Sequence, residues 1–465
     1  MTNSLSRREV IVGLGATGLA LPLLSADDKT SANTSSSNTL KSSKKLRHAS
    51  IGVGGMGGSD IGQIYGDGSK VEIIAICDVD KNTLNGAQKR FPKARAYADW
   101  RELLEKEKGN IDSINVATPD HMHAPIAMTA LQQGLHIYGQ KPLTHTIWES
   151  RRLTEMAAKM GVVTQMGIQC HATSAYRMGM AYIRAGLVGR IKEVHSWEGK
   201  DWYGKAGTLE KRPGEDKTSP IPDNLNWDLW LGVAPERPFV KQQYHAVEWR
   251  RWQDFGCGTL GDMAVHIYDP VKGALNLKYP TSVLSYQTPP FAETWAPDNK
   301  IRFTFPKTDY TVDTLNWWWY DVKMKPDCTT LGVPPGTQLP GAGSLFVGEE
   351  GSVILPHPGA PQPLPREKFA EKMVEFKTKL SAEIAPYNHY QEFVDACLGK
   401  GNTKCNFDYS GPLTETILLG LIAHRFQNKE LIWDGPALQF TNMPEANQYI
   451  KNTPYRKGWE VPGLS

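Results

Sequence analysis

The chain has 465 residues, and its 52 Lys and Arg against 49 Asp and Glu give a formal charge of +3. This length suggests about two or three domains with substantial hydrophobic cores. Hydrophobic residues make up 40% and charged residues 22%, which excludes wholesale disorder. The small net charge, without basic runs, argues against a nucleic-acid-binding protein. Six scattered cysteines exclude a disulfide scaffold and a CxxC zinc module.

Residues 1–26 have the pattern of an export signal. Arg7 and Arg8 precede an apolar run from Val10 to Leu24, which is short and glycine-containing for a bilayer-spanning helix. A paired arginine before such a run resembles a twin-arginine (Tat) signal, with an ordinary secretion signal or an uncleaved anchor as the alternatives. Residues 27–46 predict a disordered linker. We therefore expect an exported protein, periplasmic or extracellular, with no stable membrane anchor once the signal is removed.

A glycine-rich loop follows the first predicted strand, His48–Ile51. Its residues fit G-x-G-x-x-G and are Gly52, Val53, Gly54, Gly55, Met56 and Gly57. In such a loop the first glycine permits a tight turn, the second lets the backbone approach a pyrophosphate, and the third lets the next helix pack on the strand. The apolar run Val71–Cys77 predicts a buried parallel strand that ends at Asp78, where a dinucleotide fold needs an acid for the ribose hydroxyls. The acids Asp78 and Asp80 would repel a 2′-phosphate, so NAD is favoured over NADP.

Strand-like and helix-like segments then alternate as far as residue 167. The expected helices and strands are, in turn, Trp100–Lys106, Ile111–Ala117, Ala124–Gln133, Leu135–Tyr138, Ile147–Met160 and Val162–Gly167. This alternation predicts the α/β class, with a doubly wound, Rossmann-type parallel sheet over residues 47–167. Ligands of such a sheet bind at the carboxyl ends of its strands. The residues that follow those ends are Thr118, Pro119, His123, Gln140, Lys141 and Gln169.

Two distant segments carry the residues that suit alcohol oxidation. Removing hydride from a carbinol requires removal of the hydroxyl proton as well. Lys141, at a strand end, can hold that hydroxyl. Asp262 and His266 are four residues apart and share one face of a predicted helix, with His266 as the natural proton shuttle. Alone, each motif is ordinary, because a Lys-Pro is usually a surface turn and a DxxxH a helix-face salt bridge.

In this order the motifs resemble the Gfo/Idh/MocA family of sugar and polyol oxidoreductases, over essentially everything after residue 47. The resemblance rests on the glycine loop, Asp78, Thr118-Pro119 with His123, Lys141-Pro142 and the D-x-x-x-H within residues 256–266. It implies NAD contacts at the glycine loop, Asp78, Thr118, Pro119, His123, Gln140 and Lys141. It also implies that Lys141 and His266 are the acid/base pair and that Asp262 orients them; which of the pair takes the proton stays open.

One position departs from the family pattern. Gln140 stands where the family usually has the glutamate of Glu-Lys-Pro. An amide keeps the hydrogen-bonding shape but drops the negative charge, which we interpret as a change in tuning. Nearby, His121 and His123 have no carboxylate or cysteine cluster to complete a metal site, so no metal is predicted.

Residues 168–434 predict a second, α+β domain for substrate binding and oligomerisation. The resemblance implies a large open, mainly antiparallel sheet whose outer face forms the contact of a homo-oligomer, a dimer or a tetramer. The run Trp317–Tyr320 cannot point entirely inward, because alternate side chains of a strand face opposite sides. Residues 435–465 predict an extended C-terminal tail over the surface.

The leading hypothesis is an exported NAD-dependent oxidoreductase acting on a secondary hydroxyl of a sugar, glycoside or cyclic polyol. Free NAD is scarce outside the cytoplasm, so the cofactor would have to be tightly bound. One alternative is an NAD-dependent glycosidase or lyase working through a transient keto-sugar and elimination. Another is a non-catalytic sugar-binding protein with a relic cofactor fold. In each case the expected partner is a small-molecule carbohydrate or polyol, and not a nucleic acid.

Overall fold

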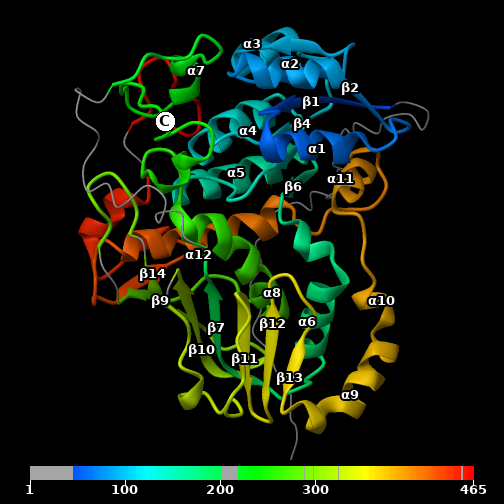
Figure 1. The fold of residues 1–465 in the computed structure, drawn as a ribbon, viewed down its shortest axis with the longest axis vertical. Helices are drawn as coiled ribbons and strands as arrows, with labels where there is room; N and C mark the ends of the chain where they lie inside the picture. The colour runs from blue at the N-terminus through cyan, green and yellow to red at the C-terminus, as the bar shows by residue number, and fades with distance from the viewer. Residues whose placement is uncertain (1–44, 201–217, 287–288, 297, 323, 452–453) are drawn as a thin grey trace, which may run out of the picture. The chain divides into compact units, whose positions relative to one another are not determined.

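The computed structural model describes residues 45–200, 218–286, 289–296, 298–322, 324–451 and 454–465 (Figure 1). The predicted signal and nearly all of the predicted linker lie outside the described residues. Within the described ranges, no helix combines the length and the apolar character needed to cross a membrane.

The first half of the described chain forms a parallel sheet of six strands in the order β3-β2-β1-β4-β5-β6 (Figure 1). Its strands are β1 Leu46–Ile51, β2 Val71–Cys77, β3 Arg95–Tyr97, β4 Ser113–Val116, β5 His136–Gly139 and β6 Thr164–Met166. Its helices are α1 Gly55–Tyr65, α2 Lys81–Arg90, α3 Trp100–Lys106, α4 His123–Gln132 and α5 Ile147–Met160. The strand order, with β1 in the middle, confirms the predicted Rossmann-type sheet.

Local side-chain caps fix the start of the helices next to the site. The carboxylate of Asp80 accepts the N–H of Asn82 at 2.8 Å and caps α2. Thr146 and Glu149 form a reciprocal capping box at the start of α5, with N···O distances of 3.1 and 3.0 Å. Because α5 begins six residues after Lys141, this box also holds the loop that carries the lysine.

The second half forms a sheet of nine strands in the order β13-β12-β11-β7-β10-β9-β8-β14-β15. Its strands are β7 Ile191–Glu198, β8 Ser282–Ser285, β9 Lys300–Phe305, β10 Thr311–Asp321, β11 Ala342–Gly348, β12 Ser352–Pro356, β13 Gln362–Leu364, β14 Leu431–Asp434 and β15 Gln439–Phe440. Only β7 and β10 pair in parallel among these described strands, which confirms the predicted mainly antiparallel sheet.

The helices of this half flank its own sheet, and some of them also contact the first half (Figure 1). They are α6 Ser174–Arg184, α7 Trp227–Leu231, α8 Val265–Leu275, α9 Arg366–Lys379, α10 Ser381–Ile384, α11 His389–Cys397 and α12 Phe407–Ala423. Helix α12 packs on α5 and also on α8 and β8. Helix α11 packs on α1, where Gln391 Nε2 donates to Gln63 O at 2.9 Å. Segments late in the sequence therefore support the loops at the edge of the first sheet.

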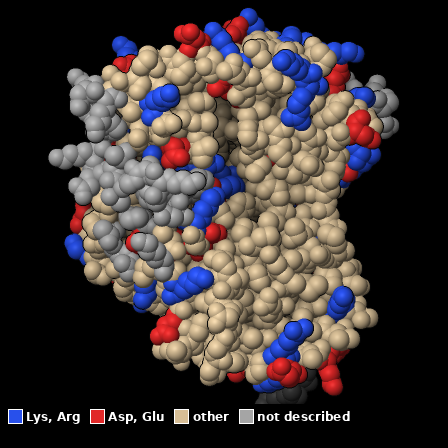
Figure 2. Space-filling view, in the orientation of Figure 1, with Lys and Arg blue, Asp and Glu red and all other residues tan. Residues whose placement is uncertain are grey.

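The aromatic run on β10 divides between the two faces of the second sheet. Trp317 and Trp319 are completely buried, whereas Trp318 stacks on His195 and Tyr286 on the other face. This alternation agrees with the strand geometry expected from the sequence. Figure 2 shows a stretch of surface with few charged side chains at the centre right of the view, whereas Lys, Arg, Asp and Glu side chains lie along the lower rim.

A buried carboxyl group at the end of β10 makes the stability of the fold depend on pH. Asp321 Oδ2 accepts hydrogen bonds from Trp319 Nε1 at 3.1 Å and from Asn299 Nδ2. Burial raises the pKa of Asp321 to about 8, so the folded protein holds this carboxyl protonated at neutral pH. Because the folded pKa lies above the unfolded value, its contribution to stability is complete at low pH and is lost as the pH rises through about 8.

We therefore expect the melting temperature of Asp321→Asn, relative to that of wild type, to be about 2–4 °C higher at pH 9 than at pH 6, measured by calorimetry. Asp313→Asn, at an exposed position of the same strand, is the control and should follow wild type at both pH values. Melting curves of wild type and Asp321→Asn that stay parallel across this range would contradict the assignment.

Candidate active site

A cavity of about 420 Å³ runs along the carboxyl edge of the first sheet. The residues of the sequence-based prediction that line it are Gly52, Gly54, Gly55, Met56, Asp78, Thr118, Pro119, His123, Gln140, Lys141 and Asp262. Three others do not line it: Gly57, Gln169 and His266. The cavity thus brings together residues from the glycine loop, three strand ends and a segment more than one hundred residues further along the chain.

The glycine loop has the geometry of a phosphate cradle. Gly52 has a φ of +80°, and a Cβ added there would lie 2.6 Å from the carbonyl oxygen of Ala117. A Cβ on Gly57 would lie 2.0 Å from the oxygen of Gly52, so this glycine allows α1 to pack against β1. Helix α1 begins at Gly55 and presents its free N–H groups to the cavity end. These features fit the pyrophosphate of a dinucleotide.

Asp78 is held rigidly beside this loop. Its Oδ2 accepts the N–H of Val53 at 3.0 Å and its Oδ1 accepts the N–H of Asp80 at 2.9 Å. Each carboxylate oxygen keeps a second lone pair, which a ribose hydroxyl can use. The position at the end of β2 and on the cavity wall fits the ribose contact that the sequence predicts.

The second half of the chain covers this cavity, which the sequence did not predict. Asn224 Nδ2 donates to Asp80 Oδ1 at 2.9 Å, and His245 Nε2 lies 3.2 Å from Asp80 Oδ2. The N–H of Asn226 donates to the oxygen of Val79 at 3.0 Å. Further residues of this cover line the cavity and are Leu229, Trp230, His245, Ala246, Val247, Trp249 and Arg250. A bound dinucleotide would therefore lie beneath residues 224–250.

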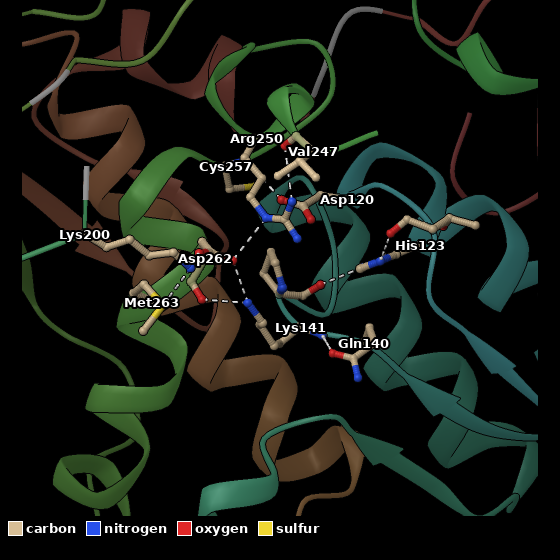
Figure 3. Close-up of polar contacts among 12 residues, drawn as sticks. Asp120, His123, Gln140, Lys141, Lys200, Val247, Arg250, Cys257, Asp262 and Met263 are labelled. Carbon is tan, nitrogen blue, oxygen red and sulfur yellow. Dashed lines mark hydrogen bonds and ion pairs between the residues drawn. The ribbon is translucent and has the colours of Figure 1, made fainter. Parts of the chain in front are cut away.

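Lys141 and Asp262 are in direct contact (Figure 3). Lys141 Nζ donates to Asp262 Oδ1 at 2.7 Å and to the main-chain oxygen of Asp262 at 2.8 Å. The same carboxylate accepts from Lys200 Nζ at 2.9 Å and from Arg250 Nε at 3.3 Å (Figure 3). Burial alone would raise the pKa of Asp262, but Lys141, Arg250 and Lys200 together hold it well below its usual range. Asp262 is therefore an ionised anchor for three cationic side chains.

Asp120 is a further acid at this end of the cavity, and the sequence did not single it out. Its Oδ2 accepts the N–H of Cys257 at 3.1 Å (Figure 3). Burial raises the pKa of Asp120 to about 7, although Arg250 and Lys141 act in the opposite direction. Asp120 follows the end of β4, so its position at a strand end could have indicated it. Lys200 and Arg250 come from segments of the second half of the chain and reach Asp262 through long-range contacts that have no local spacing signal.

His123 joins the two strand-end loops. Its Nδ1 lies 2.8 Å from the oxygen of Pro142 and its Nε2 lies 2.8 Å from the oxygen of Thr118. Burial lowers the pKa of His123 to about 4, so the ring is neutral and holds the loop next to Lys141. His121 is bound elsewhere, with Nε2 3.2 Å from the oxygen of Leu231. Across the described residues, no three His, Cys, Asp or Glu side chains are grouped as metal ligands.

His266 follows Asp262 by four residues but does not line the cavity. Asp262 is in a π-helical turn, Leu260–Ala264, that leads into α8, a departure from the regular helix that the spacing predicts. The His266 ring stacks on His357 with a centroid distance of 5.7 Å. Burial, with Lys141 and His357, lowers the pKa of His266 well below its usual value. His266 is therefore neutral, and its buried Nδ1 has no hydrogen-bond partner among the described residues.

Two family models match this chain. Residues 46–168 match the model described as an oxidoreductase family, NAD-binding Rossmann fold. Residues 188–292 match the model described as an oxidoreductase family, C-terminal alpha/beta domain. The cradle at Gly52 and the acid at Asp78 fit the NAD that the first model names.

Relatives match parts of the same region. A levoglucosan dehydrogenase of Pseudarthrobacter phenanthrenivorans is 27% identical over 183 residues, 39% of this chain and 37% of the relative. An inositol 2-dehydrogenase of Corynebacterium glutamicum is 31% identical over 118 residues, 25% of this chain and 34% of the relative. The chain thus spans little more than a third of the length of these curated relatives.

Solved structures share the fold over a longer range. The WlbA dehydrogenase from Bordetella pertussis, in complex with NADH and UDP-GlcNAcA, aligns with a TM-score of 0.57 at 18% identity. That alignment covers 85% of this chain and 99% of WlbA. This alignment shows a shared fold, and the two matched models show that residues 46–168 and 188–292 are domains of the Gfo/Idh/MocA oxidoreductase family.

Proposed function

We propose that this protein uses NAD to oxidise a secondary hydroxyl of a sugar, glycoside or cyclic polyol. The observation that carries this proposal is the contact of Lys141 Nζ with the ionised Asp262, 2.7 Å apart. The pair and the Gly52–Gly54 cradle line the same cavity. This arrangement puts a fixed ammonium group where the reacting part of a bound nicotinamide nucleotide would lie.

The residues divide the chemistry of alcohol oxidation between them. When NAD is bound, it accepts the hydride from the carbinol carbon. Lys141, whose Nζ contacts Asp262, donates a hydrogen bond to the substrate oxygen and stabilises the negative charge that develops there. His266 is neutral and accepts the hydroxyl proton. This division assigns the proton to His266, where the sequence leaves Lys141 and His266 open.

The substrate class rests on the site and on the names of the relatives. The curated relatives are named as dehydrogenases of levoglucosan and of inositol. Both names belong to polyhydroxylated ring compounds with secondary hydroxyls, which suit a cavity lined by the Lys141 ammonium and by Asp262.

We extend the proposal to location, cofactor retention and assembly. The pattern at Arg7 and Arg8 supports export. The cover formed by residues 224–250 supports a cofactor that stays bound through each cycle, as an exported enzyme requires. The stacked rings of Trp318, His195 and Tyr286, on the face opposite the buried Trp317 and Trp319, support a homo-oligomer through the second sheet.

The test uses full-length protein purified in its folded state. Mass spectrometry of the material released on denaturation should find about one nicotinamide dinucleotide per chain. Levoglucosan, myo-inositol and glucose are then added separately, without NAD, while the absorbance of NADH is followed. We expect at least one of them to produce about one equivalent of NADH. Protein without nicotinamide, and silent towards all three even with added NAD, would contradict the proposal.

The same preparation separates the glycosidase alternative. Aryl glycosides should release their aglycone without net NADH only if the hydride returns to the sugar after elimination. Aglycone release that depends on Lys141 and His266 would identify the glycosidase or lyase. The absence of release, with NADH formed from a free sugar, would identify the dehydrogenase.

A further inference from the structure

A buried carboxylate lies directly behind the residue that precedes Lys141. Asp60, on α1, is completely buried. Its Oδ2 accepts a hydrogen bond from Gln140 Nε2 at 2.8 Å, and its Oδ1 accepts one from Tyr390 Oη at 2.9 Å. The predicted site contains Gln140 but not Asp60, and Asp60 itself does not line the cavity.

Gln140 connects this carboxylate to the catalytic loop. Its Oε1 accepts the N–H of Lys141 at 3.2 Å, while its own N–H donates to the oxygen of Val116 at 2.9 Å. The amide is also confined in space, because a Cβ on Gly167 would come within 2.7 Å of its Nε2. The two ends of the carboxamide therefore have fixed partners, with Nε2 on Asp60 and Oε1 on Lys141.

We propose that Asp60 is a positioning residue: its carboxylate fixes the Gln140 carboxamide and, through it, the backbone of Lys141. The family pattern that the sequence resembles implies a glutamate at the position of Gln140. In this chain the carboxylate belongs to Asp60 on α1, and the residue before Lys141 is the amide Gln140, which donates a hydrogen bond to that carboxylate. The inference deepens the proposed function and rests on it only for the turnover measurement.

The groups around Asp60 are uncharged, so its carboxylate is the one charged group in this cluster of described residues. The titratable groups that face it are the phenols of Tyr138 and Tyr390, whose pKa values burial raises and Asp60 raises further. Gln169 donates to both phenol oxygens, at 3.3 and 3.1 Å. Burial raises the pKa of Asp60 to about 6, so it is ionised in the neutral and alkaline range. Gln169 thus belongs to this support and not to the cavity wall.

The test exchanges the two side chains that share this hydrogen bond, so that position 60 carries the amide and position 140 the carboxylate. Asp60→Asn leaves two amides face to face and removes the charged acceptor. Gln140→Glu brings a second buried carboxylate next to Asp60, where Gln140 Nε2 now lies 2.8 Å from Asp60 Oδ2, so one of the two carboxylates must take a proton or move away. The double variant Asp60→Asn/Gln140→Glu restores one carboxylate and one amide. In it the new asparagine can donate to the new glutamate and accept from Tyr390, and the glutamate can accept from the N–H of Lys141.

The first readout needs no substrate. NADH affinity is measured near pH 8 by energy transfer from the tryptophans that line the cavity, Trp100, Trp230 and Trp249. We expect each single variant to bind NADH about tenfold more weakly, since a hydrogen bond to a charged group is lost, and the double variant to recover to within about twofold. Asp67→Asn, the same change at an exposed residue of the turn after α1, should bind as wild type does.

The second readout is turnover on any sugar that the protein oxidises. We expect kcat to fall in the single variants, with KM little changed, and to recover in the double variant. A double variant no better than the weaker single variant, or Asp60→Asn equal to Asp67→Asn, would overturn the proposal. If Gln140→Glu alone does not fold and the double variant does, that rescue supports it. If the protein binds NADH but oxidises no sugar, the proposed function is contradicted, while the comparison of NADH affinities still decides whether Asp60 is a positioning residue.

Discussion

Replacing Lys141 with methionine is expected to lower turnover by about 10²–10⁴-fold, the usual contribution of a group that acts on the transferred proton or the developing charge. Methionine keeps a similar length and removes the ammonium that Asp262 holds at 2.7 Å. The Asp262 carboxylate keeps Lys200 and Arg250 as partners, so the fold should remain. The measurement is the rate of NADH formation on whichever of levoglucosan, myo-inositol and glucose the wild-type protein oxidises, with NADH affinity measured alongside.

The control for this variant is Lys106→Met. Lys106 is exposed and forms an ion pair with Glu102 one helical turn away, at 2.5 Å. Such surface pairs contribute little, about 0–1 kcal/mol, so its turnover should match that of wild type. Turnover of Lys141→Met within about threefold of this control would mean that Lys141 does not act in the reaction.

Replacing Asp262 with asparagine is expected to impair both stability and turnover. The substitution removes the buried carboxylate that Lys141, Lys200 and Arg250 share. Breaking a buried ion pair by removing one partner costs about 3–5 kcal/mol of unfolding free energy, and the released Lys141 loses its fixed position. We expect a lower melting temperature and a loss of turnover of about 10²-fold or more, measured by thermal unfolding and NADH formation.

Asp228→Asn provides the matched comparison for Asp262. The Asp228 side chain is 66% exposed and pairs with Arg456 at 2.5 Å, so its removal should cost about 0–1 kcal/mol. If Asp262→Asn melts and turns over as Asp228→Asn does, the three cations do not depend on Asp262 in the way described.

The regular elements of the first sheet follow closely from local pattern. The helices Trp100–Lys106 and Ile147–Met160 have the predicted bounds, because their apolar spacing coincides with caps at Asp99 and Thr146. Helix α12 is less easily inferred from local pattern, because it runs from Phe407 to Ala423 with Pro412 inside it. Proline normally ends a helical pattern, and packing on α5 and α8 outweighs that preference here.

The site was predictable where its residues follow strand ends. Gly52, Asp78 and Lys141 lie on the cavity wall, because parallel strands direct the following residues to one edge of the sheet. Arg250 and Lys200 come from irregular segments, and their contacts with Asp262 depend on the packing of the second half of the chain. Such long-range contacts have no local periodicity from which to infer them.

The sequence contains an unusual feature at Asp60, whose reason becomes clear from the side chains that it contacts in the structure. A carboxylate among the glycines and isoleucines of α1 is unusual on a face that packs against a sheet. The replacement of the family's glutamate by Gln140 is a second departure, eighty positions away. Read separately, neither residue indicates the other, since a single sequence does not report which side chains meet across a core.

The most direct test of this account is a crystal structure of the protein with NADH and a bound sugar. We expect the pyrophosphate against the Gly52–Gly57 loop, the ribose on Asp78, and one secondary hydroxyl of the sugar between Lys141 Nζ and the His266 ring, with its carbon facing the nicotinamide. A nicotinamide ring pointing away from Lys141, or a sugar that contacts neither Lys141 nor His266, would contradict the account.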